Sequence, residues 1–188
     1  MLFADIRGST GLGERLRPAE FSALLGAFYR LAAKAIVDAD GIVDKFVGDE
    51  AIGLFVTAYS GAAHAAKAIE AGRALLDAAA RGDGSTIGPI PVGGGVHTGV
   101  AFVGTLGSSE EISDFTALGD SVNTTARLAS LAGPGELLIS AASVEHAALD
   151  VRGLEQRTVE IRGRQESLGV YAWHAPGVVP IPPARSAT

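Results

Sequence analysis

Two aspartates, Asp5 and Asp49, stand where short apolar runs end, in Leu2-Phe3-Ala4-Asp5 and Phe46-Val47-Gly48-Asp49. Carboxylates at the tips of adjacent strands converge on hard cations, because Mg²⁺ and Mn²⁺ prefer oxygen ligands and keep open positions for phosphate. The pattern therefore predicts a two-metal site for phosphoryl transfer.

The residues that follow Asp5 are small. Gly8, Ser9 and Thr10 precede a helix that we expect to begin near Pro18. Unobstructed backbone amides in such a turn form a concavity for phosphate, although a solvated strand-to-helix turn has the same composition. A phosphatase motif with two aspartates is excluded because Arg7 occupies the position of the second one.

Composition limits the partners and the location. The chain has 188 residues, a net charge of −6 and no cysteine. No global basic field is present to hold a nucleic acid, and the absence of thiols fits a reducing compartment. No apolar run is long enough to span a membrane and no signal peptide is evident. We therefore expect a cytoplasmic protein without nucleic-acid or membrane partners.

The predicted domain covers residues 1–175, and residues 176–188 form a proline-rich tail or linker. Only four residues precede Asp5, which is short for a core strand. We therefore expect the chain to be a fragment or a module separated from an upstream regulatory domain.

Hydrophobic periodicity predicts a helix over 18–38 and a hairpin of 42–47 with 51–56, which places Asp49 in the turn and points Glu50 away from the site. The other expected elements are helices over 60–81, 120–131 and 142–148, a strand pair of 92–98 with 100–105, and strands over 136–140, 159–161 and 169–173. This order predicts an α+β fold, with a ferredoxin-like βαββαβ core, a mainly antiparallel sheet flanked by helices, and C-terminal additions.

Four motifs occur in the order and with the spacing of a known family, at residues 3–10, 45–50, 96–99 and 116–128. Together they resemble the class III nucleotidyl cyclase catalytic domain, and the resemblance extends from residue 2 to about Trp173. It implies that Asp5, Asp49 and the Ile6 carbonyl bind two divalent ions, Mg²⁺ or Mn²⁺. The implied reaction is attack of the ribose 3′-oxygen on the α-phosphorus, which releases pyrophosphate.

Asn123 and Arg127 are four residues apart on the predicted helix 120–131, so they share one face. The resemblance implies that Asn123 orients the ribose and that Arg127 stabilises charge on the transferring phosphoryl group. A guanidinium suits that role because it is permanently charged and presents a planar fork. Taken alone, the pair also fits an ordinary solvated helix face.

The resemblance assigns base choice to Lys45 and Thr116. A lysine donates to a ring acceptor and a threonine oxygen can accept from an exocyclic amine, which is the pattern of adenine. Many adenylyl cyclases carry aspartate where Thr116 stands, and this departure resembles the subgroup that includes bicarbonate-responsive enzymes. We therefore expect ATP as the substrate and bicarbonate as a candidate activator.

The resemblance also places a triphosphate-binding side chain near the end of the domain, where Arg162 and Arg164 are the candidates. A solvated pair of charges at a strand end is the alternative. His97 follows a glycine-rich strand and is interpreted as a structural histidine, because the four histidines have no metal-ligand spacing.

The resemblance further implies a head-to-tail homodimer with two composite sites. The metal aspartates of a site come from one subunit, and Lys45, Thr116, Asn123 and Arg127 come from the other. A guanylyl cyclase and a catalytically silent nucleotide-sensing or interaction module are the alternatives to an adenylyl cyclase.

Overall fold

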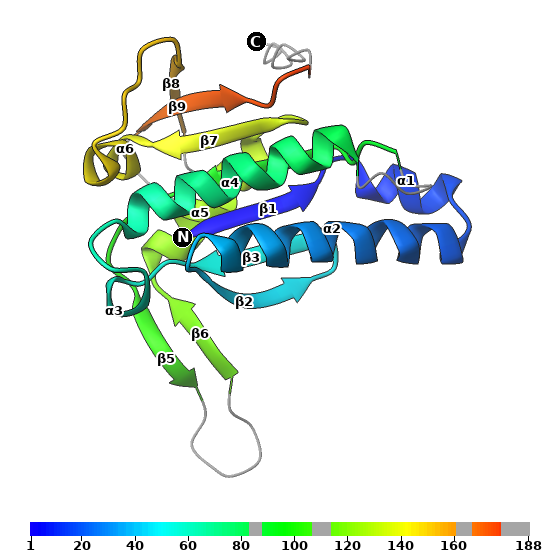
Figure 1. Cartoon of the computed structure of the whole chain (residues 1–188), viewed down its shortest axis with the longest axis horizontal. Helices are drawn as coiled ribbons and strands as arrows, with labels where there is room; N and C mark the ends of the chain where they lie inside the picture. The colour runs from blue at the N-terminus through cyan, green and yellow to red at the C-terminus, as the bar shows by residue number, and fades with distance from the viewer. Residues whose placement is uncertain (83–87, 107–113, 161–166, 178–188) are drawn as a thin grey trace.

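The computed structural model of the chain describes residues 1–82, 88–106, 114–160 and 167–177. Its main sheet has the strand order β2-β3-β1-β4-β7-β9-β8 (Figure 1). Every neighbouring pair in it is antiparallel except β4 with β7. The strands are β1 (Leu2–Ile6), β2 (Ile42–Val47), β3 (Glu50–Leu54), β4 (Val92–Val96), β7 (Glu136–Ser140), β8 (Glu155–Val159) and β9 (Leu168–His174).

Helices cover both faces of this sheet, in a βαββαβ order followed by C-terminal additions. The helices are α1 (Ser9–Arg15), α2 (Pro18–Asp38), α3 (Thr57–Ser60), α4 (His64–Arg81), α5 (Asp120–Leu131) and α6 (Ala141–Ala147). Helices α2 and α4 lie side by side over one face, and α5 lies across the other (Figure 1). The predicted α+β class and the mainly antiparallel sheet are confirmed.

The central strand β1 divides its side chains between the two faces. Leu2, Ala4 and Ile6 pack into the core beneath α2 and α4, whereas Phe3 packs into the cluster beneath α5. Because side chains alternate along a strand, Asp5 shares the α5 face with Phe3. This alternation directs the first candidate ligand away from the larger core.

Glycines in β4 allow α5 to lie close to the sheet. The β1–β4 register sets Gly95 opposite Phe3 and Gly93 opposite Asp5, so both glycines face α5. A Cβ atom at Gly95 would collide with the backbone nitrogen of Ala129 and lie 2.7 Å from the Leu128 Cβ. Glycine is therefore required there by the close approach of a helix backbone.

The predicted pairing of 92–98 with 100–105 is wrong. Both edges of β4 are occupied, by β1 and by β7, so no edge remains for the next strand. That strand, β5 (Phe102–Leu106), pairs instead with a strand the sequence did not indicate, β6 (Asp114–Leu118). The two form an antiparallel arm that projects from the body of the molecule (Figure 1). Periodicity identifies strands, but it does not say which edges are free.

Other boundaries differ by local causes. A short helix, α1, precedes the predicted helix at Pro18 because Gly8, at φ +69°, turns the chain directly into it. The predicted helix 60–81 is divided into α3 and α4 at Gly61, which has φ +73°. Most of the predicted tail lies outside the described residues. No helix in the described part of the chain combines the length and apolar character needed to cross a bilayer.

We expect Gly95→Ala to lower the free energy of unfolding by about 2 kcal/mol, because the added methyl group overpacks the β4–α5 contact. In thermal denaturation this corresponds to a fall in Tm of roughly 6 °C. Gly169→Ala in β9 is the matched control, since its Cβ would meet nothing nearer than 3.8 Å. Equal stability of the two variants would contradict the packing argument.

Candidate active site

Strand pairing brings the predicted metal ligands together. Asp5 lies opposite Glu50 in the β1–β3 register, and the backbone amide of Ile6 donates to the carbonyl of Asp49 at 3.1 Å. Asp5, Ile6 and Asp49 therefore meet at one end of two adjacent strands. The location of Asp49 in the β2–β3 turn agrees with the sequence-based expectation.

The turn that carries Asp49 is fixed from both sides. Gly48 has φ +60°, a conformation that side chains disfavour. The Tyr29 hydroxyl on α2 donates to the Gly48 carbonyl, and the Tyr29 ring stacks on Phe46 with ring centroids 4.3 Å apart. Helix α2 thus anchors the loop through one aromatic side chain, which limits the positions available to the Asp49 carboxylate.

Arg7 connects the candidate metal ligands to α5. Its guanidinium forms an ion pair with the Asp5 carboxylate and donates to the Ser130 carbonyl at 3.1 Å and the Ala132 carbonyl at 3.4 Å. Burial lowers the pKa of Arg7, and the nearby carboxylates of Asp49 and Glu50 oppose that shift. A cation at a helix C-terminus is favourable. The sequence served only to exclude a phosphatase motif at Arg7, and it did not predict the ion pair with Asp5 or the hydrogen bonds to the end of α5.

Glu50 lies nearer the site than expected. Directly opposed residues of antiparallel strands share a face, so the Glu50 side chain is on the same face as Asp5. Burial, followed by the charge of Asp49, raises the pKa of Glu50, and Arg7 opposes the rise. The expectation that Glu50 points away from the site is therefore wrong, because Glu50 begins strand β3 and does not lie within the turn.

The oxygen donors fit a hard divalent cation that is shared with a substrate. Within the described residues, no three His, Cys, Asp or Glu side chains form a group that could hold a metal by itself. Mg²⁺ is commonly bound by one or two carboxylates, waters and substrate phosphates. The carboxylates of Asp5 and Asp49 with the Ile6 carbonyl match that pattern. A cation at Asp5 would compete there with the Arg7 guanidinium.

The predicted phosphate-binding residues Gly8, Ser9 and Thr10 follow the metal ligands directly. Gly8 precedes α1, and no side chain among the described residues caps that helix. The first amides of a helix have no intrahelical acceptor. Phosphate binding at these amides stays a prediction.

The predicted base-reading residues Lys45 and Thr116 are linked by a residue that sequence reasoning missed, Asp44. The Thr116 hydroxyl donates to the Asp44 carboxylate at 3.1 Å, and the Lys45 Nζ lies 4.0 Å from the same oxygen. The Asp44 side chain is buried, with 4% exposure, while that of Lys45 is 30% exposed. Asp44 on β2 is therefore hydrogen-bonded to Thr116 on β6, and Lys45 lies beside the same carboxylate.

Asn123 and Arg127 are both exposed on α5, whereas Thr124 and Leu128 are buried beneath it. The expectation that Asn123 and Arg127 share one helix face is confirmed. In the described part of the chain, neither side chain bonds to Asp5 or Asp49. Arg162 and Arg164 lie outside the described residues.

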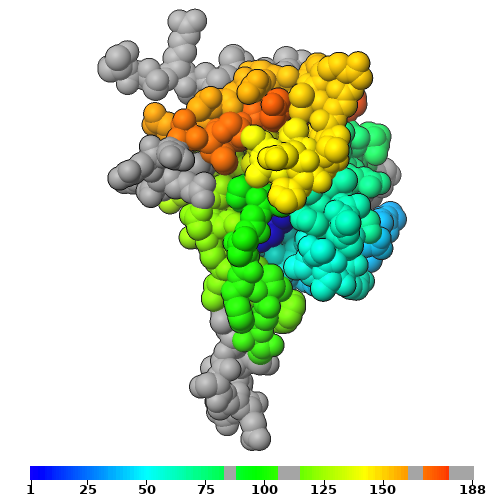
Figure 2. Space-filling model, turned by 90° about the vertical axis from the view of Figure 1, so that its left-hand side faces the viewer, coloured from blue at the N-terminus to red at the C-terminus, as the bar shows by residue number. Residues whose placement is uncertain are grey.

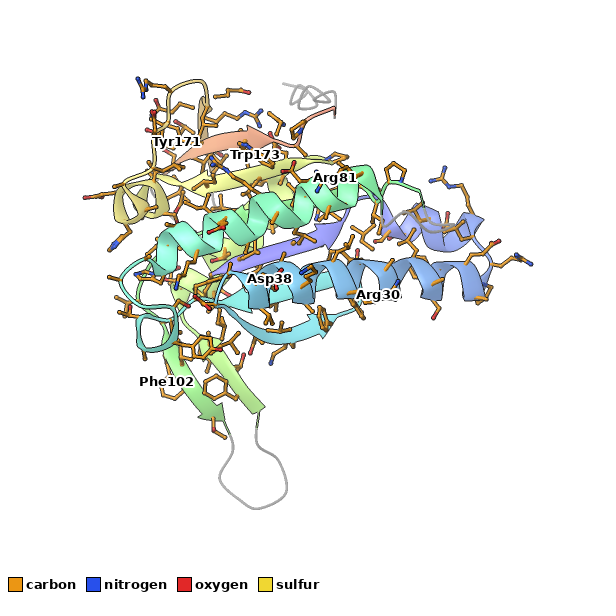
Figure 3. All side chains as sticks on the ribbon, viewed as in Figure 1. Arg30, Asp38, Arg81, Phe102, Tyr171 and Trp173 are labelled. Atoms are coloured by element: carbon orange, nitrogen blue, oxygen red, sulfur yellow. The ribbon has the colours of Figure 1, made fainter. Side chains whose placement is uncertain are left out.

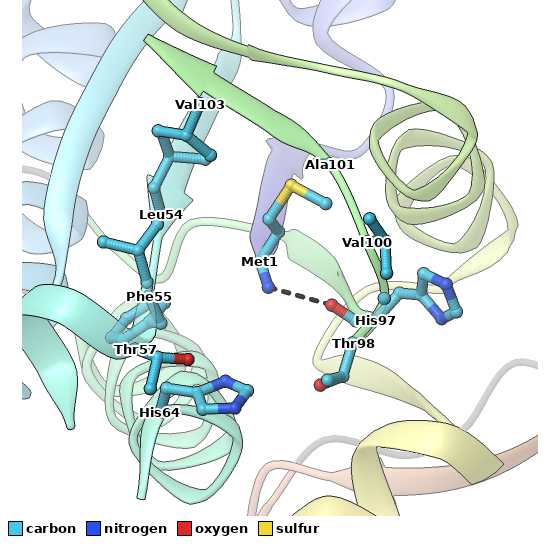
Figure 4. Close-up of a pocket in the computed structure, with 12 residues that line it drawn as sticks. Met1, Leu54, Phe55, Thr57, His64, His97, Thr98, Val100, Ala101 and Val103 are labelled. Carbon is cyan, nitrogen blue, oxygen red and sulfur yellow. Dashed lines mark hydrogen bonds between the residues drawn. The ribbon is translucent and has the colours of Figure 1, made fainter. Parts of the chain in front are cut away.

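A cavity of about 390 Å³ opens at the other end of β1. Figure 2 shows the corresponding hollow between β5 and the α3–α4 region, and Figure 4 shows Met1, His64 and His97 among its lining side chains. None of the predicted site residues lines it. His97 bonds through Nδ1 to Ser140 Oγ at 2.9 Å, as expected of a structural histidine.

Residues 1–174 match the family model described as the adenylate and guanylate cyclase catalytic domain. The chain is 32% identical over 180 residues to an adenylate cyclase of Anabaena cylindrica, and the match covers 91% of the chain and 36% of that relative. It is 28% identical over 178 residues to adenylate cyclase 1 of Rhizobium meliloti, covering 90% of the chain and 26% of the relative. The chain thus spans about a third of the length of these relatives.

Two crystal structures share the fold. The guanylyl cyclase Cya2 has a TM-score of 0.77 and 30% identity, with 91% of this chain and 88% of that chain covered. The adenylyl cyclase CyaB from P. aeruginosa has the same TM-score and 28% identity, with 91% and 90% covered. The chain therefore belongs to the class III adenylyl and guanylyl cyclase catalytic domain family.

Proposed function

We propose that this domain is an adenylyl cyclase that converts ATP to 3′,5′-cyclic AMP and pyrophosphate. One observation carries the proposal: strand pairing brings Asp5 and Asp49 to the same end of β1 and β3 in a domain of the cyclase family. In the proposed reaction the ribose 3′-hydroxyl gives up its proton to solvent, and its oxygen forms a bond to the α-phosphorus. The bond from that phosphorus to the pyrophosphate oxygen breaks.

Each predicted residue has a task in this reaction. Asp5, Asp49 and the Ile6 carbonyl would hold divalent ions, which supply Lewis acidity toward the 3′-hydroxyl and the phosphates when bound. The backbone amides of Gly8, Ser9 and Thr10 donate hydrogen bonds to the phosphate oxygens. Asn123 orients the ribose, and the Arg127 guanidinium stabilises the charge that develops on the transferring group. Arg162 or Arg164 adds a further cation for the triphosphate.

Lys45 and Thr116 support ATP as the substrate. An ammonium donates to a ring nitrogen of adenine, and the threonine oxygen accepts from its exocyclic amine. A guanylyl cyclase is the second candidate, because Cya2, at 30% identity, is a guanylyl cyclase. The same two side chains would then have to satisfy the opposite donor pattern of guanine.

The active unit of the proposed enzyme is a head-to-tail homodimer. The exposure of Asn123 and Arg127 on α5 supports this arrangement, because these side chains remain accessible to a second subunit. The β5–β6 arm also supports it, since Phe102, Phe115 and Leu118 leave about half of their surfaces exposed (56%, 49% and 47%; Figure 3 labels Phe102). Exposed apolar patches commonly mark interaction sites. We place this enzyme in the cytoplasm.

The direct test is product identification after incubation of the purified protein with Mn²⁺ and either ATP or GTP. We expect cyclic AMP to form faster than cyclic GMP.

Asp5→Asn and Asp49→Asn should lose at least about a hundredfold in rate, because each removes a charge needed to hold a cation against the phosphates. Asp150→Asn, in an exposed ion pair with Arg152, is the matched control. A wild-type preference for GTP would contradict the assignment, and full activity of either site variant would contradict the metal roles.

Complementation tests the composite site. Asp5→Asn and Arg127→Ala should each be inactive alone, yet a mixed dimer contains one site with all of its native residues. Activity should therefore return on mixing, toward about a quarter of the wild-type rate, because random exchange puts half of the subunits into mixed dimers with one intact site each. Subunit exchange is verified separately by energy transfer between labelled chains. A mixture that exchanges subunits and stays inactive would exclude composite sites.

A further inference from the structure

A β-bulge in β2 determines which side chains of that strand face Thr116. The β2–β3 register runs from Val43 opposite Gly53 to Lys45 opposite Ile52, which leaves Asp44 as an extra residue. Val43 and Phe46, three residues apart, both pack against the core beneath α2 and α4. Strict alternation would put these two side chains on opposite faces.

The bulge accounts for this break. It directs Asp44 and Lys45, although adjacent in sequence, to the same face of the sheet, where Lys45 Nζ lies 4.0 Å from Asp44 Oδ2. Bulges commonly re-aim side chains beside active sites. Asp44 is thereby buried between a lysine on its own strand and Thr116 on the β5–β6 arm.

The hydrogen bond between Thr116 and Asp44 fixes the direction of the Thr116 hydroxyl. An ionised carboxylate only accepts hydrogen bonds, so the hydroxyl proton points to Asp44 Oδ2 across 3.1 Å. The lone pairs of the Thr116 oxygen then remain for a ligand. In this orientation Thr116 accepts a hydrogen bond and does not donate one.

We propose that Asp44 is a positioning residue for base selection, which makes Thr116 an acceptor matched to the exocyclic amine of adenine and mismatched to the carbonyl oxygen of guanine. The inference deepens the proposed function and rests on it. The same carboxylate oxygen lies 4.0 Å from the Lys45 Nζ, but the effect of Asp44 on base choice runs through Thr116. Asp44 itself does not touch the substrate.

The test is the ratio of kcat/KM for ATP to that for GTP in Asp44→Asn. An asparagine amide can donate to the Thr116 oxygen, which frees the threonine proton to face guanine. We expect the ratio to fall about tenfold, equivalent to about 1.4 kcal/mol of discrimination. Asp38→Asn, an exposed carboxylate on α2 paired with Lys34, is the matched control and should keep the wild-type ratio (Figure 3).

Coupling to Thr116 separates this role from a merely structural one. Thr116→Ala should lower the same ratio by itself, because the acceptor is lost. Adding Asp44→Asn to Thr116→Ala should then change the ratio no further, since Asp44 acts through the threonine hydroxyl. Additive effects of the two substitutions would overturn the inference.

A binding measurement makes the test independent of turnover. The dissociation constants of 3′-deoxy-ATP and 3′-deoxy-GTP, which cannot cyclise, are compared in wild type and variants with Mn²⁺. If wild type prefers ATP and Asp44→Asn keeps the full preference, the inference fails while the proposed function stands. If wild type prefers GTP, both the inference about Asp44 and the proposed function fail. If wild type does not cyclise ATP, the proposed function fails, and the ratio of the two dissociation constants still decides the role of Asp44.

Discussion

The pairing of β1 with β3 is the interaction on which the candidate site depends. It sets Asp5 opposite Glu50 and bonds the Ile6 amide to the Asp49 carbonyl, so Asp5 and Asp49, distant in sequence, lie at the same end of the sheet. A slip of one residue would turn Asp5 toward α2 and α4 and bring Phe3 out of the α5 cluster. Burial of Leu2, Ala4 and Ile6 on the opposite face opposes that slip. The hydrophobic core thus fixes the register that places Asp5 on the α5 face of the sheet.

The candidate site also requires that α5 packs closely against the sheet. Gly95 leaves room for the backbone of α5 and Gly93 for the segment that follows it, and Arg7 connects the end of β1 to the last turn of α5. Thr124 and Leu128 are buried in this contact, which leaves Asn123 and Arg127 on the outer side of the helix. The packing of α5 therefore determines the direction in which Asn123 and Arg127, the proposed ribose and phosphoryl ligands, project.

Periodicity and turn chemistry were sufficient for the elements that carry Asp5, Asp49, Asn123 and Arg127, but not for β6, which carries Thr116. The helix over 18–38 follows from its apolar spacing, and the turn at Gly48 and Asp49 follows from the residue types there. Strand pairing was not predictable in the same way, because the choice of β6 as the partner of β5 depends on edges already occupied by other strands. Asp44 was missed because alternation places it opposite to Lys45. The apolar pair Val43 and Phe46, spaced by three, was the available signal of a bulge.

The central claim is that Asp5 and Asp49 jointly hold a divalent ion against the phosphates of a nucleotide. Anomalous diffraction from Mn²⁺ in crystals grown with 3′-deoxy-ATP tests it most directly. The account predicts Mn²⁺ peaks about 2.1 Å from carboxylate oxygens of both aspartates, with the Arg7 guanidinium displaced from Asp5. Nucleotide bound with its Mn²⁺ peaks away from Asp5 and Asp49 would contradict it.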